Sequence, residues 1–189
     1  MPEMKKLIFV LLFGMALLFN QEANAQFGAR VGANFANFDG FDFDSRTGLH
    51  AGIYYGLPLM DKLVIEPAIF YSQKGYKSAD NSASGRITEN LDYIDIPVLV
   101  RYQILEGLNL FAGPQGSFLF SRKYEQGGMV SKTKEVVRGY DIAGVIGAGA
   151  NLPLGFNVQA SYDFGLVDLN YFNFNVKNRV FKLALGKNF

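Results

Sequence analysis

Residues 156–164 read FNVQASYDF, and in this stretch apolar and polar side chains alternate strictly. The apolar set is Phe156, Val158, Ala160, Tyr162 and Phe164, with a polar residue between each pair of neighbours. Successive side chains of a β-strand point to opposite faces of the sheet. The stretch therefore predicts a strand with one apolar face and one polar face.

The same period of two recurs along the rest of the chain. Each run is about ten residues long, as a tilted membrane-spanning strand requires. In chain order, and with the first stretch included, the runs cover residues 27–35, 49–57, 63–72, 94–103, 108–118, 140–151, 156–164 and 181–189. We therefore expect an all-β chain of eight strands.

The connections between these runs have two sizes, which alternate along the chain. Three are short: 58–62, 105–107 and 152–155. Four are long, polar and Gly-rich: 37–46, 76–92, 121–138 and 165–177. Outer-membrane barrels have short periplasmic turns and longer extracellular loops, whereas a soluble sandwich lacks this alternation. The pattern predicts an eight-stranded antiparallel transmembrane up-and-down β-barrel with both termini periplasmic.

The direction of the two faces separates a membrane barrel from a soluble one. A lipocalin-like soluble barrel, the alternative, would point its apolar set inward. Here the polar sets are rich in small residues that suit a cramped interior. We therefore expect Val31, Ile53, Ile96 and Leu183 to face lipid, and finding them together in a central core would overturn this interpretation.

Three prolines lie inside expected strands, at Pro67, Pro97 and Pro114. Each removes a donor from the hydrogen-bond ladder. Their positions count against regular strands unless β-bulges absorb them.

The first 25 residues have the pattern of a secretory signal peptide. Lys5 and Lys6 precede an apolar run over residues 7–19, and Ala23-Asn24-Ala25 is an A-x-A cleavage site. A membrane anchor is the alternative, but a spanning helix needs about 20 apolar residues. We expect residues 1–25 to be cleaved and residues 26–189 to form the barrel domain.

The composition of the 189-residue chain agrees with this assignment. It holds 18 Phe, 10 Tyr and 21 Gly, a single His, no Cys and a formal charge of +1. Aromatic residues favour strands, and the absence of Cys excludes disulfides and thiolate metal sites. The near-neutral charge gives no electrostatic footprint for nucleic acid.

Residues 91–102, LDYIDIPVLVRY, resemble the fourth-strand signature of the small outer-membrane β-barrel family that includes porin-like and PorT-like proteins. The run FAGP at 111–114, the Gly-rich segment 141–149 and the last strand ending in Phe189 are also similar to that family. The resemblance implies a barrel in the outer membrane of a Gram-negative bacterium, and some members look like accessory parts of a secretion apparatus. The C-terminal Phe189 is similar to the signal read by the barrel-assembly machinery, although Lys187 interrupts the apolar alternation.

Residues that would carry catalysis or bind a cofactor or metal are scarce. His50 is either a general base of a lipid-acting enzyme or, as we favour, a hydrogen-bonded histidine of the barrel interior. Gly144-x-x-Gly147-x-Gly149 is not followed by the helix that a phosphate-binding loop requires. We expect no catalytic, cofactor-binding or metal-ligating residue.

Charged residues on the polar faces predict an ionic interior. With His50, the candidates are Arg30, Glu66, Asp95, Arg101, Asp163 and Lys182. Glu66 and Arg101 lie on neighbouring strands, as do Asp163 and Lys182, and we expect both to form ion pairs because a buried charge is costly unless paired. The charges would then form either a polar plug, which we favour, or a narrow ion path.

Two kinds of side chain stand out in the long connections. The 121–138 connection is basic through Arg122, Lys123, Lys132, Lys134 and Arg138, which would contact lipopolysaccharide phosphates or simply be solvated. Aromatic residues at 35, 38, 41, 43, 171, 172 and 174 indicate either longer strands or a surface that docks a protein partner. A structural or partner-docking role is therefore favoured over a narrow porin-like channel or a lipid-acting enzyme.

Overall fold

The computed structural model describes residues 26–39, 44–78, 87–172 and 174–189. The predicted signal peptide, Phe41 and Phe43 lie outside the described residues. The strands are β1 (Gln26–Asp39), β2 (Asp44–Met60), β3 (Leu63–Lys77), β4 (Ile87–Leu105), β5 (Leu108–Gln126), β6 (Met129–Ser131), β7 (Tyr140–Asn151), β8 (Phe156–Gly165) and β9 (Lys177–Asn188). A 3-10 turn, η1 (Pro153–Gly155), joins β7 to β8. No helix in the described part of the chain is long and apolar enough to cross a bilayer.

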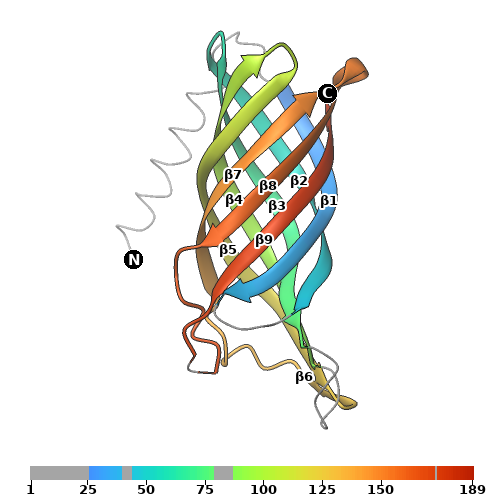
Figure 1. Cartoon of the computed structure of the whole chain (residues 1–189), viewed down its shortest axis with the longest axis vertical. Helices are drawn as coiled ribbons and strands as arrows, with labels where there is room; N and C mark the ends of the chain where they lie inside the picture. Colours follow the sequence, from blue (N-terminus) through green and yellow to red (C-terminus); the bar gives the residue numbers. More distant parts are fainter. Residues whose placement is uncertain (1–25, 40–43, 79–86, 173) are drawn as a thin grey trace, which may run out of the picture.

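Eight of these strands close into a barrel (Figure 1). Neighbours pair antiparallel in the order β4, β3, β2, β1, β9, β8, β7 and β5, and β4 also pairs with β5 to complete the ring. β6 pairs only with the end of β5, as the return arm of a projecting hairpin. Because closure leaves no unpaired sheet edge, the predicted eight-stranded antiparallel barrel is confirmed.

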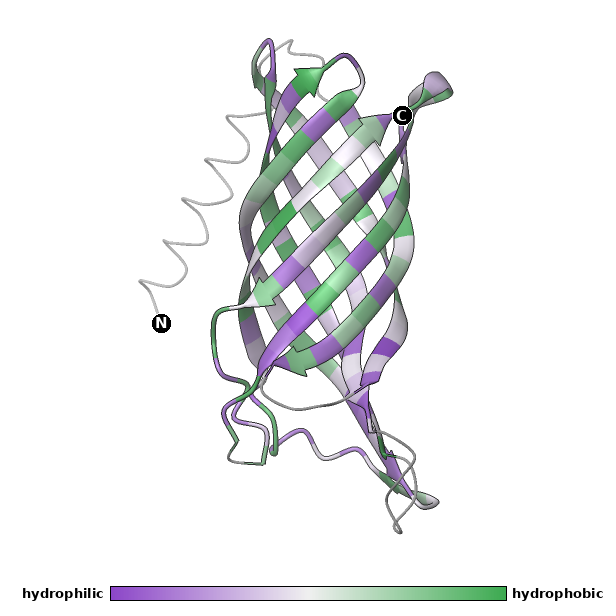
Figure 2. Ribbon diagram, in the orientation of Figure 1, coloured by the Kyte–Doolittle hydropathy of each residue, from purple (hydrophilic) through white to green (hydrophobic). Residues whose placement is uncertain are grey.

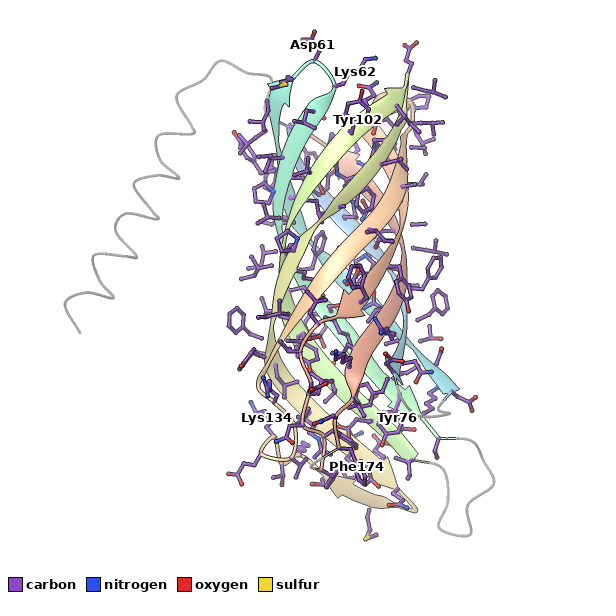
Figure 3. All side chains as sticks on the ribbon, turned by 60° about the vertical axis from the view of Figure 1, so that its left-hand side comes forward. Asp61, Lys62, Tyr76, Tyr102, Lys134 and Phe174 are labelled. Carbon is purple, nitrogen blue, oxygen red and sulfur yellow. The ribbon has the colours of Figure 1, made fainter. Side chains whose placement is uncertain are left out.

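The two ends of the barrel differ, and the residues labelled in Figure 3 identify each end. Asp61, Lys62 and Tyr102 mark what we call the terminal end, where β1 begins and β9 stops. The backbone N–H of Phe189 donates to the carbonyl of Phe27 there. The opposite end, marked by Lys134 and other labelled residues, carries the long connections and is called the loop end.

The outer wall is apolar and the interior is polar. Val31 is 55 % exposed and Leu183 is 45 % exposed, and Ile53 and Ile96 are exposed as well. Figure 2 shows hydrophilic and hydrophobic residues alternating along each strand. The expected outward orientation of the apolar set is confirmed, as an eight-stranded barrel in lipid requires.

The strands run further toward the loop end than the alternation predicts. β1 and β2 take up most of the expected 37–46 loop, β3 and β4 shorten 76–92, and β5 and β6 take up part of 121–138. In these extensions many of the inward side chains are apolar, although Glu89 and Arg122 also point inward, so the regular polar-inside pattern is lost. They pack with the connections into what we call the loop-end apolar cluster: Phe38, Tyr76, Leu91, Tyr93, Val137, Leu169, Tyr171 and Val176.

The prolines do not lie in bulges. Pro67 pairs with Val98 and Pro97 with Gln115, and the register is the same on either side of each proline, Pro114 included. The β4–β5 register instead shifts where Asp92 pairs with Ser121 and Tyr93 with Leu119, which leaves Phe120 as an extra residue.

Glycines in the wall make room for aromatic rings. A Cβ added at Gly147 would lie 2.3 Å from Cζ of Phe111 on β5, and one at Gly28 would lie 2.3 Å from Cζ of Tyr54 on β2. A strand without a side chain at that point thus accepts a ring from its neighbour, which explains a composition rich in both residue types. Gly147 therefore makes room for a ring in the barrel wall, and β7 continues past it as a strand, without the helix of a phosphate-binding loop.

Candidate functional site in the barrel interior

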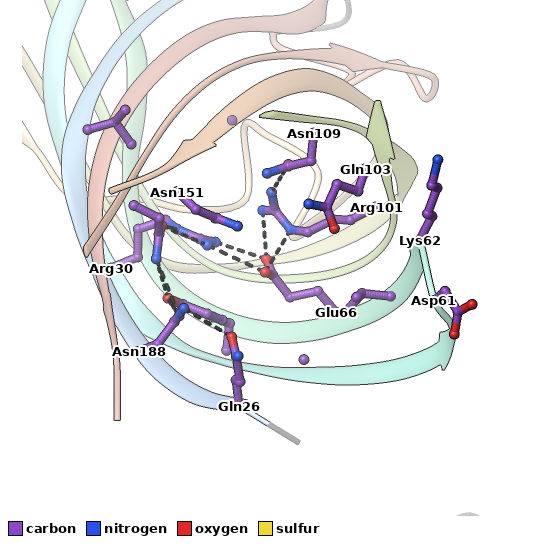
Figure 4. Close-up of a pocket in the computed structure, with 16 residues that line it drawn as sticks. Gln26, Arg30, Asp61, Lys62, Glu66, Arg101, Gln103, Asn109, Asn151 and Asn188 are labelled. Atoms are coloured by element: carbon purple, nitrogen blue, oxygen red, sulfur yellow. Dashed lines mark hydrogen bonds and ion pairs between the residues drawn. The ribbon is translucent and has the colours of Figure 1, made fainter. Parts of the chain in front are cut away.

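Three charged side chains from three strands meet near the terminal end, and we call them the Glu66 network. Arg30 of β1 donates from Nη1 to Oε1 of Glu66 on β3, at 2.9 Å. Arg101 of β4 donates from Nη2 to the same oxygen at 2.8 Å, and its Nε lies 2.7 Å from Oε2. One carboxylate therefore holds two guanidinium groups (Figure 4). The predicted Glu66–Arg101 pair is present, and Arg30 reaches Glu66 across β2.

Polar and aromatic neighbours fix both arginines in place. The Arg30 guanidinium carbon lies 3.9 Å from the centre of the Tyr54 ring, and that of Arg101 lies 4.2 Å from the centre of the Phe111 ring. Arg101 also donates to Oδ1 of Asn109 at 2.9 Å. Hydrogen bonds satisfy most of the fork donors while the rings cover the guanidinium faces, an arrangement that suits guanidinium groups better than a lysine ammonium.

A cavity of about 120 Å³ opens beside this network at the terminal end. Figure 4 shows Asp61 and Lys62 at its rim, away from the ion pairs. The other lining groups include the side chains of Gln103, Asn109 and Asn151. The cavity is therefore lined by many polar side chains, with charged groups at its inner wall and a few apolar groups such as Val64 and Val158.

A second ionic cluster, the central network, fills the middle of the barrel. Asp95 accepts from Lys74 at 2.8 Å and from Lys182 at 3.1 Å, and Lys182 also lies 2.6 Å from Asp163. All four side chains are buried. The predicted Asp163–Lys182 pair is present and belongs to a group of two lysines and two carboxylates. The cavity in this region is only about 20 Å³, space for about one water molecule.

His50 joins neither ionic cluster. Its Nδ1 lies 2.7 Å from Oδ1 of Asn34, and Asn34 donates from Nδ2 to Oγ of Ser72 at 3.0 Å. The imidazole is 3 % exposed and meets the Phe70 ring edge to face. Among the described residues, no carboxylate forms a hydrogen bond with this ring, and its burial keeps it away from the lipid surface.

Near the loop end a third pair is buried within the apolar cluster. Arg122 donates from Nη2 to Oε2 of Glu89 at 2.8 Å, and the Tyr171 hydroxyl donates to the same oxygen at 2.6 Å. Tyr171 lies in the connection before β9, outside the strands. Its burial and the nearby Glu89 carboxylate raise the pKa of the phenol well above its usual value.

The alternation could have revealed the partners that sequence reasoning missed. Lys74 continues the inward even positions of β3 beyond Ser72, and Glu89 continues the inward odd positions of β4 before Asp95. Both stand outside the runs 63–72 and 94–103, because those runs end where the outer face stops being regularly apolar.

The expected basic loop surface is smaller than predicted. Arg122 is buried rather than on the surface, because the extra residue Phe120 inverts the two faces of β5 beyond it. Lys123 forms an ion pair with Glu125. Lys132 and Lys134 are exposed, and Arg138 donates to the Tyr140 hydroxyl at 3.1 Å.

Among the described residues, His, Asp and Glu side chains do not gather in threes, as metal ligands would. The contacts that these clusters do show are ion pairs and hydrogen bonds.

Comparison with known proteins agrees with the fold. The chain is similar to Ail, the attachment invasion locus protein of Yersinia pestis, with a TM-score of 0.58 and 17 % identity over 89 % of this chain and 100 % of that one. It is similar to Neisserial surface protein A (NspA), with a TM-score of 0.57 and 14 % identity over 87 % of this chain and 97 % of that one. No protein of curated function matches the sequence closely enough to count as a relative.

These distant structures show only a shared fold, whereas a family model assigns the chain to a family. The model described as "Outer membrane protein beta-barrel domain" matches residues 19–171, more than half of the chain. The match agrees with the resemblance seen in LDYIDIPVLVRY. The chain therefore belongs to the outer membrane protein β-barrel domain family.

Proposed function

We propose that this outer-membrane barrel is a non-catalytic docking protein whose loop end captures a protein partner and whose interior is a closed polar plug. The observation that carries the proposal is the filled interior: two ionic networks and the loop-end apolar cluster follow one another along the barrel. A role as an accessory component of a secretion apparatus fits a barrel that presents a surface instead of a pore.

The filling of the interior argues against conduction. An eight-stranded barrel has a lumen just wide enough to be filled by side chains. Asp95 is fully buried between two lysines, and Leu91, Tyr93 and Leu169 are fully buried in the apolar cluster. An ion would have to break paired charges and then cross an apolar layer.

The loop end carries the surface that would bind the partner. Phe172 is 48 % exposed, and Met129 at the tip of the β5–β6 hairpin is 71 % exposed; Val130, Leu166 and Phe174 are exposed as well. The terminal end also exposes apolar side chains, Met60 and Leu154 among them, but on short turns. At the loop end such groups lie on long projecting connections, and exposed apolar groups there would mark a protein interaction surface. The base of this surface is held in place, since Phe172 N–H donates to the carbonyl of Val136 at 3.0 Å.

The orientation and targeting of the barrel belong to the same proposal. We place the terminal end in the periplasm and the loop end outside the cell, since outer-membrane barrels keep their longer loops extracellular. Cleavage after Ala25 would release the exported chain, and the strand ending in Phe189 would be read by the barrel-assembly machinery. Lys132 and Lys134 would then lie near lipopolysaccharide phosphates.

Crosslinking through the loop end tests the docking role. The variant Phe172→Ser with Met129→Ser should lose a partner that the native barrel captures from intact membranes. Leu154→Ser is the control, because Leu154 is an even more exposed apolar residue (82 %) at the opposite end. Heat-dependent gel mobility establishes that each variant is assembled. Equal capture by all three proteins would contradict the proposal.

Planar bilayers test the closed interior. The native barrel should give no steps of ion conductance. Steady conductance that changes in Glu66→Gln or Arg101→Gln would instead establish a narrow channel.

A further inference from the structure

The geometry points to a binding site for one carboxylate group in the cavity beside the Glu66 network, entered from the terminal end. This site is separate from the docking surface, because it lies at the other end of the barrel. It rests on three observations: the charge of the network, the polar lining and the open space.

The Glu66 network carries more positive than negative charge. Arg30 and Arg101 share the carboxylate of Glu66, so two cations face one anion. The other ion-paired clusters balance, with Lys74 and Lys182 against Asp95 and Asp163, and Arg122 against Glu89. At the rim, Asp61 and Lys62 offset each other. A buried charge without a counterion is unfavourable, so one further negative charge would stabilise this end.

The lining supplies hydrogen-bond donors in addition to charge. Asn109 accepts from Arg101 through Oδ1, so its amide nitrogen is the group left to donate. Gln103 and Asn151 add two more carboxamides around the same cavity. Neutral amides next to guanidinium groups favour an anion that accepts several hydrogen bonds, because donors to a charged acceptor form the stronger bonds.

The charge and the space together favour a carboxylate over a phosphate. A carboxylate brings one negative charge, which matches the single excess positive charge among the side chains of the Glu66 network, whereas a phosphate group brings about −1.5 to −2. The cavity of about 120 Å³ is close to the size of engineered cavities that admit a benzene ring. A small acid fits this space whole, and a peptide would insert its terminal carboxylate.

Gly56 allows the cavity to be blocked without changing any charge. It lines the cavity, and a Cβ added there would lie 3.5 Å from Cγ1 of Val64 and 3.7 Å from the carbonyl oxygen of Gln26, both ordinary contacts. Gly56→Leu should therefore fill the cavity while the barrel still assembles. Gly116→Leu is the control, because a Cβ at Gly116 meets nothing within 4 Å and Gly116 pairs with the exposed Ile96.

The test is an NMR titration of the assembled barrel in detergent micelles, with acetate replacing chloride at constant ionic strength. The Nε–H signals of Arg30 and Arg101 should shift and saturate, while the signal of Arg138 at the loop end should not. Gly56→Leu should weaken acetate binding at least tenfold, and Gly116→Leu should change it less than twofold. Shifts that do not saturate, or that persist unchanged in Gly56→Leu, would overturn the site.

Two further probes identify the ligand. Sodium phosphate binding more tightly than acetate would refute the assignment to carboxylates. N-acetylglycylglycine and its C-terminal amide distinguish a peptide C-terminus from a small carboxylic acid as the ligand. Tighter binding of N-acetylglycylglycine than of acetate assigns the site to a peptide C-terminus, and equal or weaker binding assigns it to a small acid. In both cases the amide should not bind, and binding of the amide as tight as that of the free acid would overturn the proposal.

Discussion

Replacing Asp95 by Asn tests whether the central network stabilises the barrel. Asp95 is fully buried, with Lys74 at 2.8 Å and Lys182 at 3.1 Å from its two carboxylate oxygens. Asn keeps the shape of the side chain and removes its charge. The substitution therefore removes one partner from two ion pairs and leaves the packing in place.

The expected loss of stability depends on the partners that each lysine retains in Asp95→Asn. Lys182 still has Asp163 at 2.6 Å. Lys74 retains the Ser117 hydroxyl at 3.1 Å and the Tyr93 ring, whose centre is 4.8 Å away. Among the described residues it keeps no carboxylate at ion-pair distance, and the buried Asp141 attracts it from further away. Breaking a buried ion pair from one side costs about 3–5 kcal/mol. With an m-value of about 2 kcal/mol per molar urea, the unfolding midpoint should fall by about 2 M.

Reversible urea unfolding of the barrel in lipid vesicles measures this loss, and two variants serve as controls. Asp39→Asn also breaks an ion pair, with Arg179, but those side chains are 52 % and 32 % exposed, so the cost should be about 0–1 kcal/mol. Lys74→Met added to Asp95→Asn removes the unpaired cation and should restore part of the stability. If Asp95→Asn is within about 1 kcal/mol of Asp39→Asn, the network does not stabilise the fold as argued.

Three further substitutions probe other parts of the barrel. Leu183→Arg places a charge on the lipid-facing wall and should lower the free energy of unfolding by about 2–4 kcal/mol; a neutral effect in vesicles would contradict the outward orientation. Gly147→Val should cost about 1–3 kcal/mol or more because its Cβ would lie 2.3 Å from the Phe111 ring, whereas Gly139→Ala, with open space around its Cβ, should be neutral. Tyr171→Phe should cost about 1–3 kcal/mol, since Glu89 loses a buried donor. Because the pKa of Tyr171 is raised in the folded state, its hydroxyl contributes fully to the free energy of unfolding below about pH 10, and this contribution is lost as the pH rises. A pH titration of phenolate absorbance should show one buried tyrosine fewer in the variant.

The strands could be predicted from the sequence because lipid imposes the same requirement on every strand. Each residue that faces the bilayer must be apolar, so Val31 and Leu183 repeat a pattern that needs no knowledge of their neighbours. The prediction fails beyond the bilayer, where inward residues such as Leu91 and Tyr93 become apolar too. The alternation of apolar and polar residues then no longer distinguishes the two faces, and these parts of the strands are predicted as loops.

The ionic clusters could be predicted only where they join adjacent strands. Glu66–Arg101 and Asp163–Lys182 follow from the order of the strands and the inward faces. The Arg30–Glu66 contact spans β2, and the Lys182–Asp95 contact crosses the interior from β9 to β4. Those contacts depend on the tilt of the strands and the width of the lumen, which no single run encodes. The burial of Arg122 depends on one bulged residue, Phe120, whose effect on register is invisible in the pattern.

The central network also determines how the two ends of the barrel relate. Coupling between distant sites requires an element with two alternative arrangements that both sites can bias. The central lysines and carboxylates are buried and paired around a cavity of about 20 Å³, which leaves no room for a second arrangement. A partner bound at the loop end should therefore leave the affinity of the terminal cavity for acetate unchanged within about twofold, a coupling of under 0.5 kcal/mol. A larger effect would establish that the central side chains rearrange, and the plug would then be a transmitting element and not a fixed one.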